Sequence, residues 1–358
     1  MLKFLFQRSL SGLSVLLGVI VIIFILLQLI PVNAEQMSLG QNADEETVMA
    51  MKKKLRLNYS PAQRLWFYLS DLSPVSIQSH SNPDAPLYLK NGDYQYVEWL
   101  KFKHKSIVLK KPYMGRSFQS DKPVLEILRR KLVSTLILAC SAIGLASIIG
   151  VMLGILSALN YGTFMDRGLI SLSVLGISIP SYFSALVLAI VFGYYLSDWT
   201  KLNITGPLLD VSDVGEYFIN WKNLILPTIA LGIRPVAIIL QLTRNSMLDV
   251  LRADYVRTAK AKGLSEQKVI IKHALRNALN PVVTSITGWF AALLAGAFFV
   301  EYIFDFKGLG HETVHALTMF DFPLVMGSVL IIAFSFVFVN ILVDILYTYL
   351  DPRINING

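Results

Sequence analysis

Six long apolar stretches constrain the fold of this chain more than any other feature. They lie at about residues 10–30, 132–159, 168–196, 224–242, 282–300 and 325–350. At about 1.5 Å of rise per residue, a helix of about twenty apolar residues crosses the hydrocarbon core of a bilayer. A mean hydropathy of +0.56 with only 16% charged residues agrees, because a water-soluble globule of 358 residues does not easily bury so much apolar surface. The sequence therefore predicts an all-α integral membrane protein with six membrane-spanning helices.

The formal net charge of +8 is explained by membrane orientation and does not require nucleic acid as a partner. Lysine and arginine gather beside membrane spans, where they orient the chain and meet anionic lipid. We therefore expect membrane lipid as a partner and no nucleic acid. Cys140 is the only cysteine and stands in an apolar stretch, which excludes an intrachain disulfide and a thiolate metal site.

The first transmembrane helix is expected within residues 1–31, preceded by Lys3 and Arg8. A cleaved signal peptide is the alternative, because residues 32–34 (Val-Asn-Ala) have the small-residue spacing of a cleavage site. The apolar stretch is longer than a usual signal-peptide core, which favours a retained helix. Both interpretations place residue 35 outside the cytoplasm.

The polar region 32–131 is expected to form an external loop region, although it is rich in lysine. The positive-inside rule weakens for loops longer than about 60 residues. An accessory insertion near 73–113 includes an alternating pattern on both sides of Asn91-Gly92, which is a strong signal for a small β-hairpin. The aromatic residues of this insertion form either a minor local core or a partner-binding surface: Tyr88, Tyr94, Tyr96 and Trp99.

Small residues recur every four positions in two of the predicted spans. Such a stripe makes one helix face smooth, so another helix can pack against it closely. The stripes are Ala142, Ala146, Gly150, Gly154 and Ala158 in the second span, and Gly288, Ala292 and Gly296 in the fifth.

Three residues inside the predicted spans are candidates for a transport pathway. Pro180 removes a helical hydrogen bond and predicts a kink or break in the third span. Arg234 is a charge within the fourth span, so it is expected either to face a water-filled pathway or to form a structural ion pair. Asp344, one helical turn after Asn340, is the third candidate.

The segment 254–281, which joins the fourth and fifth spans, is too basic to lie within a bilayer and is expected inside the cell. Its first part, Tyr255 to Lys262, is a run of good helix formers. Gly263 is a typical helix stop, and Ser265 is a typical N-cap for a second helix that ends near Pro281. The sequence predicts a helix–turn–helix whose small residues allow another protein to approach and whose lysines can pair with acidic groups.

This segment resembles the coupling loop of the membrane-spanning permease subunits of ATP-binding-cassette (ABC) importers, in the oligopeptide, dipeptide and nickel branch. The signature there is Glu-Ala-Ala, three residues, Gly, nine residues and Ile-x-Leu-Pro. Ala259, Gly263 and Leu275 match it, whereas Arg257, Thr258, His273 and Arg276 depart from it. Residues 300–327, with Val-Glu-x-Ile-Phe, Gly-Leu-Gly and Asp-Phe-Pro, also resemble this branch. The coupling helix that docks on the ATPase would use Arg257, Thr258, Ala259, Lys260, Ala261, Lys262, Gly263 and Leu275.

The resemblance implies a type I ABC importer permease core at 132–350, a cytoplasmic coupling loop at 246–281 and a cytoplasmic tail at 351–358. It also implies a multi-pass protein of the bacterial inner membrane with both termini in the cytoplasm. The expected partners are a second homologous permease, two cytoplasmic ABC ATPase subunits and an external solute-binding protein. Peptides are the expected substrate, and nickel or another small solute is the alternative.

The chain contains no Gly-Lys-Ser/Thr phosphate-binding loop. We therefore expect a transporter subunit that is not an enzyme and has no cofactor of its own. ATP and Mg would be used by the partner ATPases.

Residues 311–315, His-Glu-Thr-Val-His, match the helical motif of zinc proteases. His311 and His315 would be ligands and Glu312 would activate water. No glutamate follows Glu312 to complete the usual ligand set, and the motif lies in a short connection between spans, so we expect no metal site. The other alternative is a secondary transporter or channel, which would leave the helix–turn–helix at 254–281 without a role.

Overall fold

The computed structural model describes residues 2–29, 49, 52, 56–81, 85–89, 94–211 and 216–350. The Asn91-Gly92 pair, the possible cleavage site at 32–34 and the tail at 351–358 lie outside the described residues. The chain falls into two compact units, each described by itself. Unit 1 comprises Met1–Leu10, Lys131–His311 and Phe334–Gly358, and unit 2 comprises Ser11–Arg130 and Glu312–Ala333.

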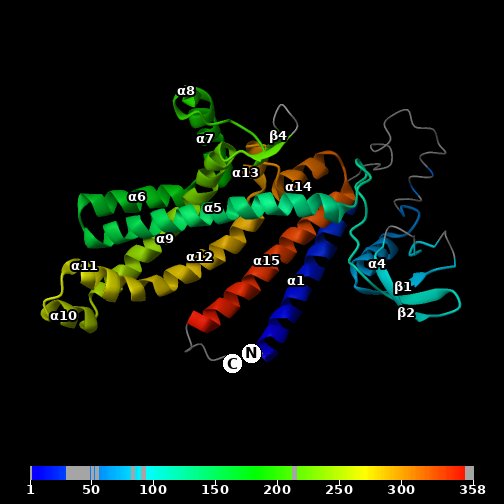
Figure 1. The fold of residues 1–358 in the computed structure, drawn as a ribbon, viewed down its shortest axis with the longest axis horizontal. Coiled ribbons are helices and arrows are strands. Elements are labelled where there is room, and N and C mark those ends of the chain that lie inside the picture. The colour runs from blue at the N-terminus through cyan, green and yellow to red at the C-terminus, as the bar shows by residue number, and fades with distance from the viewer. Residues whose placement is uncertain are drawn as a thin grey trace. The chain divides into compact units, whose positions relative to one another are not determined.

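Helices make up most of the described chain, and five of them are long (Figure 1). Within the described residues, five helical segments are long and apolar enough to cross a membrane, and a bent pair of helices adds a sixth span if it counts as one. The predicted fold class is therefore confirmed. The long helices are α1 (Leu2–Leu29), α5 (Val124–Leu159), α9 (Lys222–Leu251), α12 (Arg276–Gly296) and α15 (Phe322–Leu350).

The third span is broken at the predicted position. Helix α6 (Phe164–Ser178) ends just before Pro180, and α7 (Ser181–Leu188) begins just after it and continues into a π-helix, η1 (Ala189–Tyr195). The two halves are bent by 103° relative to each other. Proline at the N-cap of α7 has no N–H to donate and holds Ile179 in an extended conformation, which ends α6.

Helix α9 forms the centre of unit 1 and packs against α6, α7 and α12. The small-residue stripe of α5 packs against it as well, because a Cβ on Gly150 or Gly154 would lie only 2.8 Å from Ile239 or 2.6 Å from Thr243. All five residues of that stripe are buried, which confirms the prediction for the second span. In contrast, the stripe of the fifth span, Gly288, Ala292 and Gly296, is exposed in the single chain.

The basic segment, residues 254–281, is helical almost throughout. It contains α10 (Asp254–Ala261), α11 (Glu266–Lys268), a π-helical stretch η2 (Val269–Leu275) and the first turns of α12. The predicted helix end at Pro281 is wrong, because α12 continues through Pro281 to Gly296. Proline within a membrane helix is tolerated where neighbouring groups satisfy the freed carbonyls.

Short elements follow the third and fifth spans of unit 1. They include α8 (Ser197–Thr200), the two-stranded antiparallel sheet β4 (Leu209–Val211) and β5 (Tyr217–Ile219), α13 (Phe298–Ile303) and α14 (Leu309–Thr318), whose first residues belong to this unit.

Unit 2 carries a small α/β subdomain. Helix α4 (Pro61–Leu72) begins with a capping box in which Ser60 and Gln63 exchange side-chain-to-backbone hydrogen bonds. The strands β1 (Val75–Ser79), β2 (Tyr96–Lys101) and β3 (Lys105–Lys110) form an antiparallel sheet in the order β1-β3-β2. A hairpin is present in the predicted insertion, but it joins β2 to β3, so Tyr96–Lys101 pairs with the segment after it.

A buried acid, Asp71, organises this subdomain. Its carboxylate accepts hydrogen bonds from Arg56 at 2.8 Å and from the Tyr94 hydroxyl at 2.9 Å, and the Lys110 ammonium donates to its backbone carbonyl at 2.6 Å. Burial, followed by the nearby Asp71 charge, raises the pKa of Tyr94, and burial lowers the pKa of Lys110. Tyr94 thus belongs to a local core, whereas Trp99 is 71% exposed.

Candidate functional site

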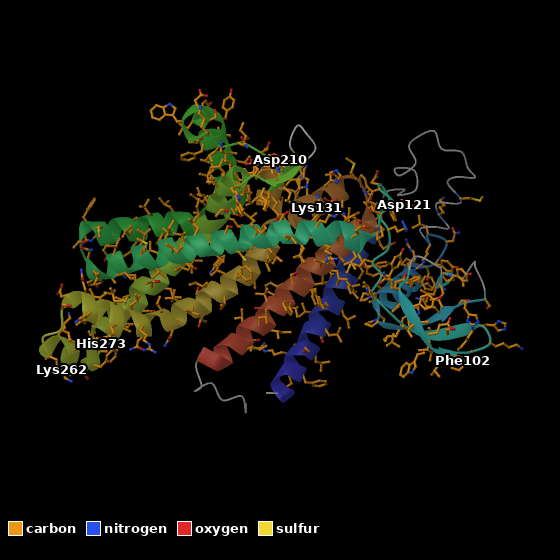
Figure 2. All side chains as sticks on the ribbon, viewed as in Figure 1. Phe102, Asp121, Lys131, Asp210, Lys262 and His273 are labelled. Atoms are coloured by element: carbon orange, nitrogen blue, oxygen red, sulfur yellow. The ribbon has the colours of Figure 1, made fainter. Side chains whose placement is uncertain are left out.

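The basic segment forms a compact elbow rather than an extended loop. Helix α10 ends at Ala261, and Gly263 follows with φ +78°, the left-handed conformation that glycine adopts without strain. The chain then turns into α11 and η2, so the two arms of the elbow pack on each other. Figure 2 shows Lys262 at the turn and His273 on the returning arm.

The structure separates the predicted coupling residues into an exposed group and an inward-facing group. The exposed residues are Arg257, Thr258, Lys260, Ala261, Lys262 and Gly263. Ala259 is only 6% exposed and packs with Val256 and Val269, while Leu275 is half-buried. The small side chain of Ala259 therefore serves the packing of α10 on η2, and the surface available to another protein is basic and centred on the Gly263 turn.

The elbow is firmly attached to the spans. Leu275 packs against a buried cluster made by Ala158 of α5, Met247 of α9 and Ala278 of α12. Val250 and Leu251, at the end of α9, pack against the Val256 cluster of the elbow. Because packed cores deform little, a displacement of α10 would be passed on to the ends of α5, α9 and α12.

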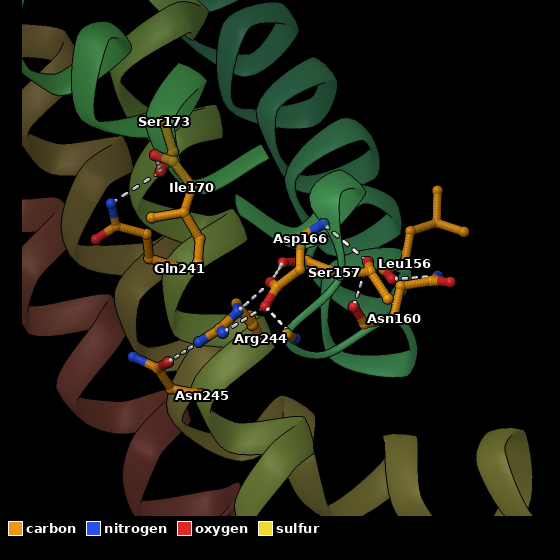
Figure 3. Close-up of polar contacts among 11 residues, drawn as sticks. Leu156, Ser157, Asn160, Asp166, Ile170, Ser173, Gln241, Arg244 and Asn245 are labelled. Carbon is orange, nitrogen blue, oxygen red and sulfur yellow. Dashed lines mark hydrogen bonds and ion pairs between the residues drawn. The ribbon is translucent and has the colours of Figure 1, made fainter. Parts of the chain in front are cut away.

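A buried ion pair ties the ends of three spans together near the same elbow (Figure 3). Arg244 of α9 donates from Nε to Asp166 Oδ1 at 2.7 Å and from Nη2 to Oδ2 at 2.8 Å, which is a bidentate pair. Ser157 of α5 donates to Oδ1 of the same carboxylate at 2.5 Å. The guanidinium also lies over the Tyr161 ring, 5.3 Å from its centre. The ends of α5, α6 and α9 are thus joined through one carboxylate.

Neither Asp166 nor Arg244 was predicted as a site residue. Arg244 lies just past the predicted end of the fourth span at residue 242, and Asp166 lies in the turn before the third. Charges one turn beyond a span usually face water, so their positions alone gave no sign of pairing. Only the packing of α6 on α9 brings them together.

A second buried acid, Glu301, was part of the family-like pattern but not of the predicted site. It is fully buried on α13. Its Oε1 accepts a hydrogen bond from the Thr135 hydroxyl at 2.7 Å, and its Oε2 accepts from the N–H groups of Gly310 at 2.7 Å and His311 at 3.1 Å. Thr135 in turn accepts from the N–H of Leu309 at 2.8 Å. These contacts satisfy the first N–H groups of α14, which a helix cannot satisfy by itself.

The Gly-Leu-Gly pattern exists because the Glu301 carboxylate fills the space beside it. A Cβ on Gly308 would lie 2.5 Å from Glu301 Oε2, and a Cβ on Gly310 would lie 2.5 Å from the Phe298 backbone. Burial raises the pKa of Glu301 to about 7, although the hydrogen bonds from Thr135, His311 and Gly310 act in the opposite direction. Glycines at these two positions and the buried acid therefore form one structural unit.

The three predicted pathway residues occupy different environments. Pro180 lies at the break between α6 and α7. Arg234 is exposed on α9, and within the described part of the chain no carboxylate forms an ion pair with it. Asp344 of α15 forms an ion pair with Arg8 of α1, with Arg8 Nε 2.9 Å from Asp344 Oδ2. No hydrogen bond or ion pair joins any two of these three described residues.

The zinc-protease motif does not form a metal site among the described residues, where no group of three His, Cys, Asp or Glu side chains is placed to hold an ion. His311 instead lies with Nε2 2.8 Å from Asp305 Oδ1. Burial, with the neighbouring Lys307, lowers the pKa of His311. The first histidine of the motif is therefore in contact with Asp305.

The spans, the broken third span and the basic elbow define a membrane protein that crosses the bilayer several times. Comparison with known protein families shows to which family it belongs. Residues 150–356 match the model of the binding-protein-dependent transport system inner membrane component, and residues 1–90 match the model of its N-terminal region. The chain belongs to this family of ABC importer permeases.

Individual relatives agree with the family assignment. The chain is 33% identical to the dipeptide transport system permease protein DppB of Alkalihalophilus pseudofirmus, over 99% of each chain. It is 37% identical to DppB of Bacillus subtilis over 79% of this chain and 84% of that protein. A solved structure of the MetNI methionine ABC transporter aligns with a TM-score of 0.48 and 15% identity, over 63% of this chain and 97% of that chain. This last likeness is too distant to bear on function.

Proposed function

We propose that this chain is the permease subunit of an ATP-driven importer of di- and oligopeptides. Its family and the dipeptide permeases to which it is similar, over 99% and 79% of this chain, support this substrate class. In this proposal the chain forms half of the translocation pathway beside a second homologous permease. Two cytoplasmic ATPases, which use ATP and Mg, and an external solute-binding protein complete the importer.

The observation that carries the proposal is the exposed basic surface around Gly263 on a firmly packed elbow. An ATPase with acidic groups around a groove would bind this surface. When the ATPase pair closes, α10 would move. Its packing on α9 and on η2, which leads into α12, would turn that movement into a change of access to the pathway. This chain would carry no catalytic site, and its own contribution would be mechanical.

The proposal also assigns an orientation. The basic elbow would face the cytoplasm of a bacterial cell, with both termini on that side of the inner membrane and the subdomain of unit 2 outside. Arg234, exposed on α9, would face the hydrated pathway or the second permease. The break at Pro180 would give the third span a point at which the pathway can open.

A pair of matched glycines tests the coupling role. Gly263 has φ +78° and Gly162 has φ +79°, and a Cβ at either position would meet nothing within 4 Å. Gly263→Val and Gly162→Val therefore introduce a similar backbone strain, on the order of 1–2 kcal/mol. In proteoliposomes containing both permeases, the ATPases and the binding protein, we expect Gly263→Val to abolish most dipeptide uptake while ATP hydrolysis continues. Gly162→Val should keep both activities.

Equal uptake by the two variants would contradict a special role for the Gly263 turn. Cross-linking gives an independent measurement, because a photoreactive group at exposed Lys262 should capture the ATPase and one at exposed Lys201 should not. Uptake of Ni²⁺ with no uptake of dipeptide would overturn the substrate class while leaving the coupling role intact.

A further inference from the structure

The sheet of unit 2 has an inverted distribution of polar and apolar side chains. Its buried face carries polar residues from β1 and β3, namely Ser76, Gln78, Ser106 and Lys110, with Val108. Its outward face is apolar, and we call it the apolar sheet face: Val75, Ile77, Val97, Leu100 and Leu109, all exposed. The strand register places these residues in two rows on one side, with Val75 and Val97 opposite Leu109, and Ile77 and Leu100 opposite Ile107.

A sheet in contact with water on one side normally exposes its polar face and buries its apolar face. On the buried face, Lys110 donates to the Asp71 carbonyl, Gln78 Nε2 donates to Ser76, and the Ser106 hydroxyl lies 3.1 Å from His80 Nδ1. Each polar residue of this face thus has a partner within the subdomain, although Gln78 Oε1 is buried without one. A contiguous apolar surface of this kind marks a contact with an apolar medium or partner.

The hairpin between β2 and β3 extends this surface with basic residues. Residues 101–105, which we call the hairpin tip, read Lys-Phe-Lys-His-Lys and are all exposed. Phe102 is 58% exposed and Trp99, just before the tip, is 71% exposed. Figure 2 labels Phe102 at this hairpin. Within residues 96–105, three lysines oppose a single acid, Glu98.

A lipid surface matches this composition better than a protein groove does. Tryptophan and other aromatic side chains favour the level of the lipid headgroups, and lysines next to them attract anionic lipid. The subdomain is also tied to the end of a membrane helix, because Arg64 of α4 donates a hydrogen bond to Gln28 near the end of the α1 span. Because the subdomain is attached at the end of a membrane helix, its surface can contact the bilayer.

We propose that the apolar sheet face and the hairpin tip of unit 2 lie against the bilayer surface, with Phe102 and Trp99 at the headgroup level and Lys101, Lys103 and Lys105 bound to anionic phospholipid. The subdomain would thus be a lipid-contacting platform in addition to any other role of the external region. This inference does not depend on the transported substrate.

Depth-dependent fluorescence quenching tests the proposal on the full-length permease. In a Cys140→Ser background, Phe102→Cys is labelled with an environment-sensitive dye, and the protein is reconstituted into vesicles that carry a quencher near the headgroups. We expect strong quenching in vesicles containing about one third phosphatidylglycerol, and shielding of the dye from aqueous iodide. The triple charge reversal Lys101→Glu, Lys103→Glu and Lys105→Glu should remove most of that quenching.

A matched triple reversal controls for net charge. Lys260, Lys262 and Lys268 are also exposed but belong to the basic segment. The triple variant Lys260→Glu, Lys262→Glu and Lys268→Glu should therefore leave the quenching at residue 102 unchanged. A dye that stays open to iodide in anionic vesicles would overturn the proposal, as would equal quenching in neutral and anionic vesicles. Shielding that appears only after a soluble binding protein is added would show a protein-docking surface instead and would likewise overturn it.

Discussion

Two acids of unit 1, Asp166 and Glu301, are both buried but are held in opposite ways. Asp166 faces the Arg244 guanidinium in a bidentate pair that joins the ends of α5, α6 and α9. Glu301 is held by a hydroxyl and by two backbone N–H groups at the start of α14. Asp166 is therefore stabilised by one cationic side chain, whereas Glu301 is stabilised mainly by the backbone conformation at the start of α14.

The difference determines how each site responds to change. An ion pair stripped of one partner leaves an uncompensated charge in the interior, so the Asp166 site should be sensitive to side-chain substitution. Glu301 lies outside the spanning segments and has a pKa raised to about 7 by burial, so it can be neutral or charged near physiological pH while its donors stay in place. Its site should be sensitive to pH and to any side chain added at the two neighbouring glycines.

The largest expected effect comes from breaking the ion pair. Arg244→Ala leaves Asp166 buried without its cation, and we expect a loss of about 3–5 kcal/mol in the free energy of unfolding. The midpoint of thermal unfolding of the purified permease in detergent measures this loss. Arg167→Ala is the matched control, because Arg167 is adjacent to Asp166 in sequence but exposed, and it should change the midpoint little.

A double-mutant cycle sharpens this result. Adding Asp166→Asn to Arg244→Ala removes the stranded charge, so the double variant should be more stable than the sum of the two single effects implies. Strict additivity would mean that the pair does not act as a unit.

The next effect is a pH dependence at Glu301. Its folded-state pKa of about 7 lies above the ordinary value of 4.5, so its stabilising contribution is fully present below pH 4.5 and is lost as the pH rises through about 7. The loss amounts to roughly 3 kcal/mol, at about 1.4 kcal/mol per pH unit. Glu301→Gln keeps the shape and has no proton to lose, so the stability difference between variant and wild type should change across this window. A constant difference from pH 4.5 to 7 would contradict the raised pKa.

The smallest effect concerns the backbone shape around Glu301. Gly310→Ala places a Cβ 2.5 Å from the Phe298 backbone, and a backbone atom cannot easily move away. We therefore expect a loss of about 1–3 kcal/mol in the free energy of unfolding, followed by thermal unfolding. Gly288→Ala adds the same methyl group to α12 where nothing lies within 4 Å, so it should be neutral or slightly stabilising. Similar losses for both variants would contradict the role of the close contact with Phe298 as the reason for glycine at position 310.

Several features of the fold and the candidate site followed from local sequence rules. The break at Pro180 follows from the missing proline N–H, and the turn at Gly263 follows from the freedom of glycine at positive φ. The stripe from Ala142 to Ala158 predicted close packing because spacing by four residues places small side chains on one helix face. The first two features depend on the backbone within about one helical turn, and the third depends on the spacing of small side chains along one helix.

Other features depended on contacts between residues far apart in the sequence. The Asn91-Gly92 signal predicted a hairpin, yet β2 pairs with β3, because strand pairing is decided by the whole sheet and its buried face. The small side chain of Ala259 predicted close approach by another protein. In the structure, Val269 of the same elbow packs against Ala259 instead.

The amino-acid sequence by itself determined that this chain spans a membrane, where its third span breaks and where a basic helical elbow leaves the spans, because apolar length, proline and glycine act locally. Only the tertiary structure decided which face of the elbow is exposed, that Arg244 meets Asp166 across 78 residues of chain, and that Glu301 caps α14. These outcomes depend on how helices pack in three dimensions. The energy of a buried charge, or of a Cβ added to a glycine, is set by the atoms that the fold places beside it.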